Sequence, residues 1–427
     1  MKIYFDMVGC RLNQAEIDAL AIDFAQAGAE IVSNPGEADT IIINTCCVTA
    51  KASADSRKMI RHYRDAYAGR VISTGCWVSV DFNEAEKISH AAYPNQGKNL
   101  IAADLSFNLP KTKLDLTAKP RLGRRSRTRG FVKVQDGCNN SCSFCLTTIA
   151  RGKSESQSVE TIVSRVKQLE DMNVKEIVLT GVQLGSWGKD LRPRSSLSHI
   201  VEAILEGTQM PRLRFSSIEP WDIDSKLIEL LNHPRICAHL HIPLQSGADA
   251  ILRGMRRPIT TQRYLDMIET IRQVVPEIAI TTDIISGFPG ETEDLFQKSF
   301  EFIQKCNFDG GHVFSFSPME GTTAAELPEQ VKPFLIKERT RILISHFAEQ
   351  EQKAKQAMIG QISQVLFESR SVKNGKSWYS GFTENYFRVV HKSPSNLINK
   401  IIPVTIEAVD SNKNLVAALH NSPAPFA

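Results

Sequence analysis

The sequence has no run of 18 apolar residues, which excludes a membrane-spanning helix of ordinary length. Its first ten residues, MKIYFDMVGC, contain neither a basic leader nor a long apolar segment, so we expect no secretory signal. A protein that stays in the cytoplasm keeps its thiols reduced, and clustered cysteines then indicate metal binding or catalysis rather than disulfides. We therefore expect a cytoplasmic protein whose nine cysteines require a chemical explanation.

The chain also lacks a strong excess of charge of one sign. Its formal net charge is +4, so the charge of the whole chain does not argue for nucleic acid. One stretch differs, because KPRLGRRSRTRGFVK, residues 119–133, has basic side chains and no acidic ones. Such a run is either a solvated linker or a contact with phosphates, in which case binding depends on salt. We assign 118–130 as a basic linker and take Arg124, Arg125 and Arg127 as candidate RNA contacts.

The first part of the chain alternates apolar runs with helical patterns. At 427 residues the length predicts two to four domains, and 42% apolar with 23% charged residues is ordinary for a globular protein. The runs KIYFDMV, DTIIINTC, RVISTGC and NLIAA are typical of strands, and 14–26 and 50–68 of helices. Apolar strands separated by helices favour a parallel sheet covered on both faces. We expect a flavodoxin-like open α/β sheet over residues 1–117.

The strand and helix alternation restarts near residue 131. Six runs are typical of strands, namely FVKVQDG, EIVLTGV, RLRFSSIE, HLHIPLQS, IAITTDIISG and GHVFSFSP, and helical patterns such as 159–172 and 261–274 lie between them. Six such repeats with right-handed crossovers curl into a partial (βα)6 barrel, which we expect over 131–358. Each run ends in polar or glycine-rich residues, and the carboxyl ends of barrel strands are where the chemistry of such folds lies.

The end of the chain has a different pattern. Residues 337–359 are charged and helical, and Gly360 is a natural stop. Short alternating runs separated by turn residues follow, which predicts a small antiparallel β barrel over 359–427. Small barrels of this kind are common nucleic-acid-binding appendages, and a purely structural cap is the alternative.

Three cysteines in VQDGCNNSCSFC, namely Cys138, Cys142 and Cys145, follow the first predicted barrel strand. Thiolates suit an iron–sulfur cluster or zinc, but a structural zinc site needs four ligands and no fourth Cys or His lies nearby. Three thiolates leave one iron of a 4Fe–4S cluster open at the barrel mouth, where it can bind a substrate or cofactor. Phe144 either lies against whatever binds there or packs in the core; zinc and buried thiols stay open as alternatives.

A second set of cysteines shares a position in the first domain. Cys10, Cys46 and Cys76 each follow or end a predicted parallel strand, and such strand ends meet at one edge of the sheet. They are candidate ligands of a second cluster, and burial as plain apolar side chains is the alternative. Cys47 must point elsewhere because it adjoins Cys46. We assign Cys237 and Cys306, in helix-like contexts, to core packing.

These motifs together resemble the radical S-adenosylmethionine methylthiotransferases over essentially the full length. The matching segments are GCRLNQAE, NTCCVT, TGCW, CNNSCSFC, ARG at 150–152, EIVLTGVQLGSWG, RLRFSSIEP, HLHIPLQSGAD, TTDIISGFPGETE and HVFSFSP. The tail GFTENYFRV resembles the TRAM domain, an RNA-binding barrel. QDGC, ARG and the FTENY tail favour the threonylcarbamoyladenosine tRNA methylthiotransferase subfamily. Thr148, where a proline is usual, and Ile259, where a tyrosine is usual, depart from its pattern.

The resemblance implies cofactors and a reaction. A 4Fe–4S cluster on Cys138, Cys142 and Cys145 would bind S-adenosylmethionine and cleave it to a radical. A second 4Fe–4S cluster, on Cys10, Cys46 and Cys76, would hold the sulfur that another S-adenosylmethionine methylates. The methylthio group would reach carbon 2 of N6-threonylcarbamoyladenosine at position 37 of tRNA. A flavodoxin or ferredoxin is the expected electron donor, and the protein would have no membrane partner.

Other residues at the strand ends are candidate contacts. Those we assign to the S-adenosylmethionine site are Phe144, Gly181, Gln183, Ser217, Glu219, Gln245 and Asp283, with the loop 287–291 as a further cofactor contact or a simple tight turn. Those we assign to RNA, besides the basic linker, are Arg151, Asn385, Tyr386 and Arg388. Tyr386 is also a candidate for the barrel core.

Two other functions fit the same pattern. Within the class, the target is isopentenyladenosine in tRNA or an aspartate of a ribosomal protein. In another class, the chain is an iron–sulfur RNA-binding or electron-transfer protein without transfer activity. Electron-transfer clusters usually have four cysteine ligands, so three-cysteine sites argue against the last reading.

Overall fold

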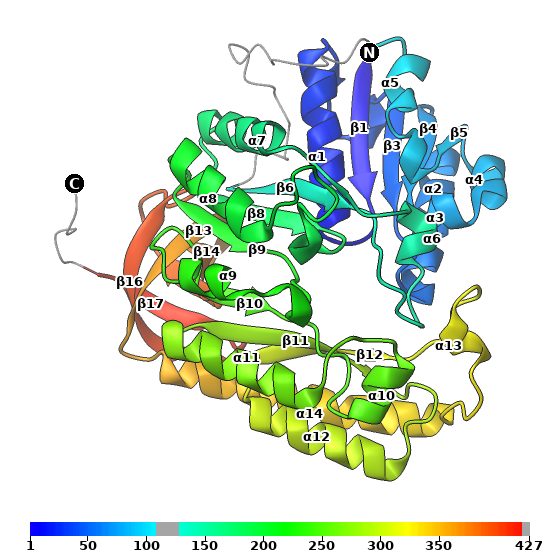
Figure 1. Ribbon diagram of the computed structural model, residues 1–427. Helices are drawn as coiled ribbons and strands as arrows, with labels where there is room; N and C mark the ends of the chain where they lie inside the picture. Colours follow the sequence, from blue (N-terminus) through cyan, green and yellow to red (C-terminus); the bar gives the residue numbers. More distant parts are fainter. Residues whose placement is uncertain (108–127, 421–427) are drawn as a thin grey trace.

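The computed structural model describes residues 1–107 and 128–420, and it has three parts (Figure 1). The N-terminal part is a parallel sheet in the order β2-β1-β3-β4-β5, with strands β1 (Lys2–Met7), β2 (Glu30–Ile31), β3 (Thr40–Thr45), β4 (Arg70–Gly75) and β5 (Ala91–Tyr93). This strand order is that of flavodoxin-like folds, as the sequence predicts. The candidate linker residues Arg124, Arg125 and Arg127 lie outside the described residues.

Helices cover both faces of this sheet. Its longer helices are α1 (Arg11–Gln26) and α2 (Ala50–Ala66), and its shorter ones are α3 (Cys76–Val80), α4 (Phe82–Ile88) and α5 (Leu100–Asp104). Alternate strand residues face opposite layers, so that Ile42 packs in the cluster of α1 while Ile41 and Ile43 pack in the cluster of α2. Because the strands are buried on both faces, they have the continuous apolar runs seen in the sequence.

One predicted strand is wrong. The run NLIAA forms helix α5, and the last strand of the sheet is instead β5, whose sequence AAY gave no signal. A short apolar run fits a buried helical turn as well as a strand, and here Ile101 and Ala102 fill the core beside α1 from a helix. Periodicity alone does not separate the two cases.

The central part is a partial barrel of six parallel strands, as predicted. These are β6 (Arg129–Asp136), β8 (Glu176–Gly181), β9 (Arg212–Phe215), β10 (His239–His241), β11 (Ala279–Ser286) and β12 (Gly310–Ser315), with the short β7 (Glu155–Ser156) beside β6. Regular pairing is interrupted between β9 and β10, where isolated parallel bridges such as Ser217 with His241 continue the wall. The main helices are α6 (Thr147–Arg151), α7 (Val159–Asp171), α8 (Leu197–Gly207), α9 (Ser225–Leu230), α10 (Asp249–Gly254), α11 (Thr261–Val274), α12 (Glu293–Cys306), α13 (Thr323–Glu326) and α14 (Pro333–Ala357).

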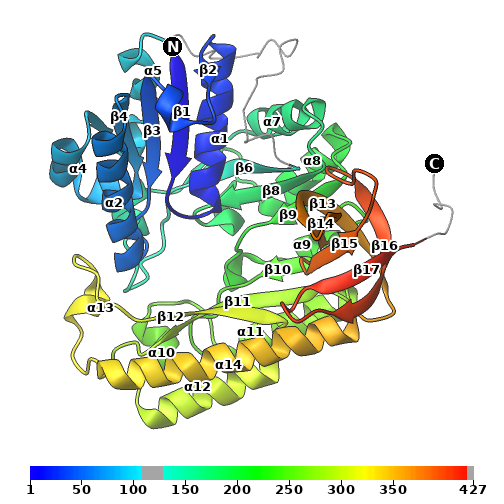
Figure 2. The same cartoon turned by 180° about the vertical axis from the view of Figure 1, so that it is seen from behind.

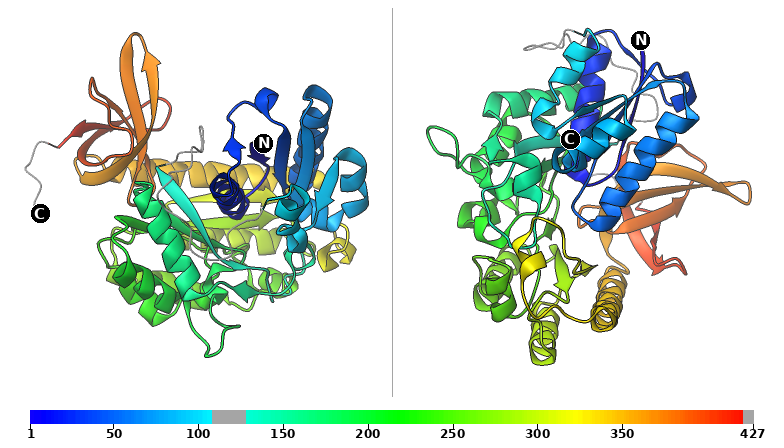
Figure 3. Two further views of the ribbon diagram at one scale, coloured as in Figure 1. Left: turned by 90° about the horizontal axis from the view of Figure 1, so that it is seen from above. Right: turned by 90° about the vertical axis from the view of Figure 1, so that its right-hand side faces the viewer.

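The C-terminal part is a closed five-stranded barrel in the order β13-β14-β15-β17-β16. Its strands are β13 (Ile362–Lys373), β14 (Lys376–Thr383), β15 (Arg388–Lys392), β16 (Ile401–Val409) and β17 (Leu415–Leu419). All pairs are antiparallel except β15 with β17, which is parallel. The predicted barrel is present, with this one parallel pair as the difference. Figures 2 and 3 show it beside the central barrel, on a different side from the N-terminal sheet.

The basic run ends in structure rather than in a linker. Arg129, the first residue of β6, forms an ion pair with Glu368 of β13 at 2.5 Å, and Thr128 donates a hydrogen bond to the same carboxylate. The linker therefore ends before Thr128, and the last two residues assigned to it belong to the barrel wall. In the described ranges, 1–107 and 128–420, no helix is long and apolar enough to cross a membrane.

A buried carboxylate stabilises the junction of the two barrels. Glu176, whose side chain is 1% exposed, pairs with Arg214 at 2.8 Å and with Arg212 at 3.3 Å. Burial alone would raise the pKa of Glu176, but the two guanidinium groups outweigh it and lower the pKa to about 2. Arg214 also donates to the carbonyl of Thr383 in the C-terminal barrel, so this pair joins the two parts.

We expect Glu176→Gln to lower the free energy of unfolding by about 3 kcal/mol, because it leaves two buried guanidinium groups without their carboxylate. The folded-state pKa is depressed, so the contribution of Glu176 is complete above pH 4.5 and is lost as the pH falls toward 2. Urea unfolding of the full chain followed by fluorescence measures both effects. The matched control is Glu202→Gln, which breaks an exposed pair with Lys226 and should change stability by less than about 1 kcal/mol.

Candidate active site

A cavity of about 640 Å³ lies between the N-terminal sheet and the mouth of the central barrel. Cys10, Cys46 and Cys76 line it from the first part, and Cys145 is the member of the second set that lines it. Cys47 lines it as well, so the expectation that this residue points elsewhere is wrong. The sequence places these cysteines up to 135 positions apart, from Cys10 to Cys145. Their meeting at one cavity is the main geometric feature of the molecule.

Two glycines bring the first set of cysteines together. Gly9 has φ +128°, and a Cβ there would lie 2.8 Å from the Cβ of Cys46. Gly75 has φ +106°, and a Cβ there would lie 2.5 Å from the backbone nitrogen of Thr45. Only glycine tolerates both the conformation and the close approach. This explains why the sequence reads GC before the first and third of these cysteines.

The second set lies in the loop between β6 and α6. Several hydrogen bonds hold this loop: the Cys138 amide donates to the carbonyl of Gly152, and Ser143 donates to the carbonyls of Met255 and Gly254. Burial raises the pKa values of the Cys138 and Cys142 thiols to about 11. Their protons must leave when a metal binds, so assembly of the site releases protons.

The donor set fits iron–sulfur ligation. Each set offers three thiols, and thiolates are the usual ligands of 4Fe–4S clusters. No group of three His, Cys, Asp or Glu side chains in the described ranges converges closely enough to hold a single metal ion. The thiols are therefore considered as ligands of a multi-iron cluster rather than of a single metal ion. Cys237 and Cys306 are 2% and 0% exposed, consistent with the core packing assigned to them.

The candidate S-adenosylmethionine contacts divide into two groups. Phe144, Gly181, Ser217 and Asp283 line the cavity, and Phe144 also packs against a small apolar cluster of the barrel. The other three do not line it in the described structure. Gln183 accepts from the Cys138 thiol at 3.4 Å, and Glu219 pairs with Arg257 at 2.6 Å. Gln245 has a backbone φ of +73° and forms an isolated parallel β-bridge with Ile284.

The loop 287–291 has the features of a tight turn. The Gly287 amide donates to the Glu291 carboxylate at 2.9 Å, and Arg339 of α14 pairs with that carboxylate at 3.0 Å. The loop is thus held by its own hydrogen bond and by an ion pair from α14. These contacts are those expected of a tight turn, which is the alternative to a cofactor contact for this segment.

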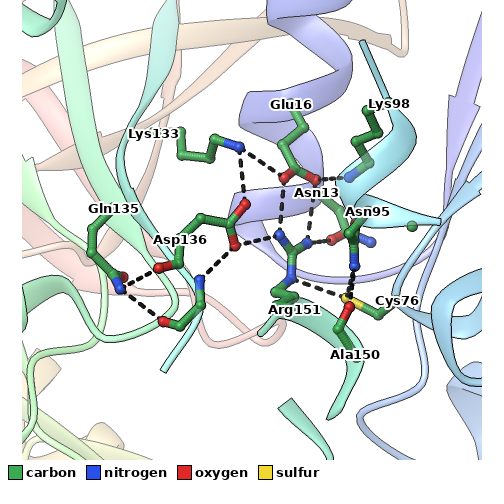
Figure 4. Close-up of polar contacts among 12 residues, drawn as sticks. Asn13, Glu16, Cys76, Asn95, Lys98, Lys133, Gln135, Asp136, Ala150 and Arg151 are labelled. Carbon is green, nitrogen blue, oxygen red and sulfur yellow. Dashed lines mark hydrogen bonds and ion pairs between the residues drawn. The ribbon is translucent and has the colours of Figure 1, made fainter. Parts of the chain in front are cut away.

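Arg151 has a different environment from the predicted phosphate contact. Its side chain is only 3% exposed, and it pairs with Glu16 of α1 and Asp136 of β6 at 2.9 Å each. Figure 4 shows the guanidinium group between these two carboxylates, with the sulfur of Cys76 beside it. The residue joins the first two parts of the molecule instead of facing solvent.

The predicted RNA contacts of the C-terminal barrel lie in different places. Tyr386 contacts both other parts, because its hydroxyl accepts from Arg11 at 3.3 Å and from Arg129 at 3.1 Å. Its ring stacks on Phe382 with centroids 4.8 Å apart. Asn385 accepts from Thr383 at 2.6 Å, and Arg388 is exposed on β15.

Sequence reasoning missed several residues of the cavity. His241 and His312 line it with their rings 5.9 Å apart, and Arg11 lines it from the N-terminal part. Nε2 of His241 lies 3.1 Å from the carboxylate of Asp283, and Nδ1 forms a hydrogen bond with the hydroxyl of Thr281 at 2.9 Å. The alternation in HLH and GHVFS placed these histidines on one face of their strands, but only the three-dimensional arrangement of the strands shows that this face is the cavity.

The chain matches two family models. Residues 132–303 match the Radical SAM superfamily, and residues 2–93 match the Uncharacterized protein family UPF0004. Among solved structures, the radical S-adenosylmethionine methyltransferase TsrM from Kitasatospora setae has a TM-score of 0.54 at 12% identity, covering 76% of this chain and 74% of that one. The cobalamin-dependent S-adenosylmethionine radical enzyme OxsB has a TM-score of 0.51 at 10% identity, covering 79% and 56%. These two likenesses show the fold alone.

Full-length relatives are more similar. The threonylcarbamoyladenosine tRNA methylthiotransferase MtaB of Bacillus subtilis (strain 168) is 33% identical, with 95% of this chain and 93% of that protein covered. The protein of the same name from Thermotoga maritima is 30% identical, with 95% and 94% covered. A tRNA-2-methylthio-N(6)-dimethylallyladenosine synthase from Moorella thermoacetica is 31% identical, with 93% and 94% covered. Relatives with both kinds of nucleoside in their names are thus similar to this chain.

We expect the anaerobically reconstituted protein to be brown and to bind about eight irons per chain, as two four-iron clusters require. Cys46→Ser should lose about four of them, since one thiolate of the first set is gone. The matched control, Cys237→Ser, alters a buried thiol away from the cavity and should keep all of them. Iron and sulfide analysis measures this, and about four irons in the unchanged protein would leave Cys10, Cys46 and Cys76 as packing.

Proposed function

This chain belongs to the radical S-adenosylmethionine tRNA methylthiotransferases, and we propose that within this family it acts on N6-threonylcarbamoyladenosine at position 37 of tRNA. It is an enzyme that transfers a sulfur group. Its cofactors are S-adenosylmethionine and two 4Fe–4S clusters. The proposed product carries a methylthio group on carbon 2 of the adenine.

The observation that carries the proposal is the single cavity between the two cysteine sets. Cys138, Cys142 and Cys145 would hold the cluster that binds S-adenosylmethionine, and Cys10, Cys46 and Cys76 the second cluster. The bound cofactors supply radical chemistry and the methylthio group. A radical must act close to the sulfur that it captures, so both cysteine sets have to serve one substrate position. Leu12, Leu146, Phe314 and Met319 also line the cavity and help to exclude water from it.

The polarity of the cavity supports threonylcarbamoyladenosine over isopentenyladenosine. Its lining includes His241, Asp283 and Ser216, and Arg11 adds a positive charge. A threonylcarbamoyl group carries N–H donors, a hydroxyl and a carboxylate, whereas an isopentenyl group offers only hydrocarbon. Polar lining groups that the hydrocarbon substituent leaves without a partner would disfavour isopentenyladenosine.

The remaining parts would serve the same reaction. We assign 1–117 to the second cluster, 131–358 to the radical chemistry and 359–427 to tRNA binding, with the basic linker 118–127 after the first of these. Of the residues assigned to RNA that the structure describes, the exposed Arg388 is the one whose surroundings suit a phosphate contact. A low-potential donor such as flavodoxin or ferredoxin would supply the electron. We expect an enzyme that acts on tRNA to be cytoplasmic.

We expect cells without this protein to lack 2-methylthio-N6-threonylcarbamoyladenosine and to accumulate its unthiolated precursor. Nucleoside mass spectrometry of total tRNA measures both, and restoring the protein with Cys138→Ala should not rescue the modification. If that nucleoside is unchanged while the methylthio form of isopentenyladenosine disappears, the proposed target is wrong. If both nucleosides are unchanged, mass analysis of ribosomal proteins tests the remaining target.

In vitro, we expect the enzyme to methylthiolate an anticodon stem–loop that carries threonylcarbamoyladenosine and not one that carries isopentenyladenosine. His241→Phe should slow the reaction by roughly tenfold or more, because it removes a polar side chain from the lining of the cavity. Phe314→Leu, which changes an apolar residue of the same cavity, should cost less. If the unchanged enzyme preferred the substrate with isopentenyladenosine, the proposed preference for threonylcarbamoyladenosine would be wrong.

A further inference from the structure

One buried side chain contacts both cysteine-bearing parts of the active site. Arg151, at the end of α6, uses all five of its N–H donors (Figure 4). Its Nη1 donates to Glu16 and Asp136 at 2.9 Å each, and its Nη2 donates to Asn13 at 2.9 Å and to Glu16 at 3.2 Å. The fifth donor, Nε, contacts the sulfur of Cys76 at 3.0 Å.

The positions of these partners along the chain are informative. Asp136 is two residues before Cys138, and Arg151 itself is six residues after Cys145. Asn13 is three residues after Cys10, in the first turn of α1. One guanidinium group therefore restrains the backbone close to both cysteine sets, and it touches one candidate ligand directly.

The charges around Arg151 are balanced with little solvent. Glu16, with a side chain 4% exposed, also pairs with Lys98 at 2.5 Å and with Lys133 at 3.2 Å. Burial on its own would raise the pKa of Glu16, but Lys98, Arg151 and Lys133 hold it well below its usual range. The carboxylate is therefore charged, and the guanidinium group is held in place by ion pairs that water screens weakly.

The sulfur of Cys76 accepts hydrogen bonds from two side chains. Asn95 donates to it at 3.6 Å, beside the Nε contact from Arg151 at 3.0 Å. Two N–H donors, one of them charged, thus face this one sulfur of the first set.

We propose that Arg151 is a positioning residue that donates a charged hydrogen bond to the Cys76 sulfur and thereby raises the reduction potential of the second cluster. Hydrogen bonds to ligand sulfurs and nearby positive charge both stabilise the more negative, reduced state of a cluster. The same side chain fixes the two cysteine sets relative to each other through Asp136 and Glu16. This role is independent of which nucleoside the enzyme modifies.

The experiment isolates the second cluster in the full-length protein. Cys138, Cys142 and Cys145 are all changed to alanine, the protein is reconstituted anaerobically with iron and sulfide, and the remaining cluster is titrated by potentiometry with electron paramagnetic resonance. We expect about four irons in this background. A protein without iron would overturn the assignment of Cys10, Cys46 and Cys76, and the inference with it.

Three further variants are compared in the same background. Arg151→Gln should shift the midpoint potential of the cluster to more negative values, and Arg151→Lys, which keeps the charge but loses the Nε donor, should shift it in the same direction by less. The matched control is Lys133→Met: Lys133 pairs with Glu16 and Asp136 in the same network at 3.2 and 3.0 Å, and no contact with Cys76 is seen for it in the described structure. Because this change removes a more distant charge and no donor to the sulfur, it should shift the potential by less than either Arg151 variant does.

The lysine variant keeps the experiment decisive if the glutamine variant does not fold, because it retains a cation opposite Glu16 and Asp136. Thermal unfolding and iron content of each variant identify that case. A midpoint potential in Arg151→Lys and Arg151→Gln equal to that of Lys133→Met, with iron retained, would overturn the proposal and leave Arg151 as a structural ion pair only.

Discussion

The structure depends on the ion pairs that Arg151 makes with Glu16 and Asp136. They connect α1 of the N-terminal sheet with the first strand of the barrel at a point shielded from water. Removing one partner would leave a buried charge without its counter-charge, which is strongly destabilising. These contacts thus specify how the two parts sit on either side of the cavity.

A second junction fixes the small C-terminal barrel. Tyr386 lies among Arg11, Arg129 and Arg214, with the Arg214 guanidinium 4.5 Å from the ring centroid. Cations over an aromatic face are worth more when they are desolvated, as Arg214 is here. Since Arg11 follows Cys10 directly, the RNA-binding unit of the proposal contacts the chain beside a proposed cluster ligand. In the proposed enzyme, the RNA-binding barrel and a cluster ligand would thus be linked through the contact of Arg11 with Tyr386.

The sequence predicted the main architecture because each strand is an apolar run bounded by glycine or polar residues. Periodicity located the parallel sheet, the six barrel strands and the terminal barrel, and the shared position of Cys10, Cys46 and Cys76 after their strands brought them to one edge. Periodicity did not identify α5 and β5, because elements of three to five residues are too short to show a hydrophobic period. For Arg151 the sequence predicted contact with RNA, whereas the side chain is buried. The sequence does not distinguish a buried arginine from an exposed one, and the partners Glu16 and Asp136 are distant from Arg151 in the chain. His241 and His312 became recognisable as part of the site only from the curvature of the partial barrel, which turns their strand faces toward the cavity.

The two cysteine sets differ in how the folding chain presents them. Cys138, Cys142 and Cys145 lie within eight positions of one loop, so a nascent or partly folded chain already holds them near one another. Cys10, Cys46 and Cys76 come from the ends of three strands and meet only after β1, β3 and β4 have paired through long connections. With the proposed ligands, metal loading at the second set would follow formation of the sheet, whereas the first set would be available earlier. The topology would then impose an order in which the two sets are loaded.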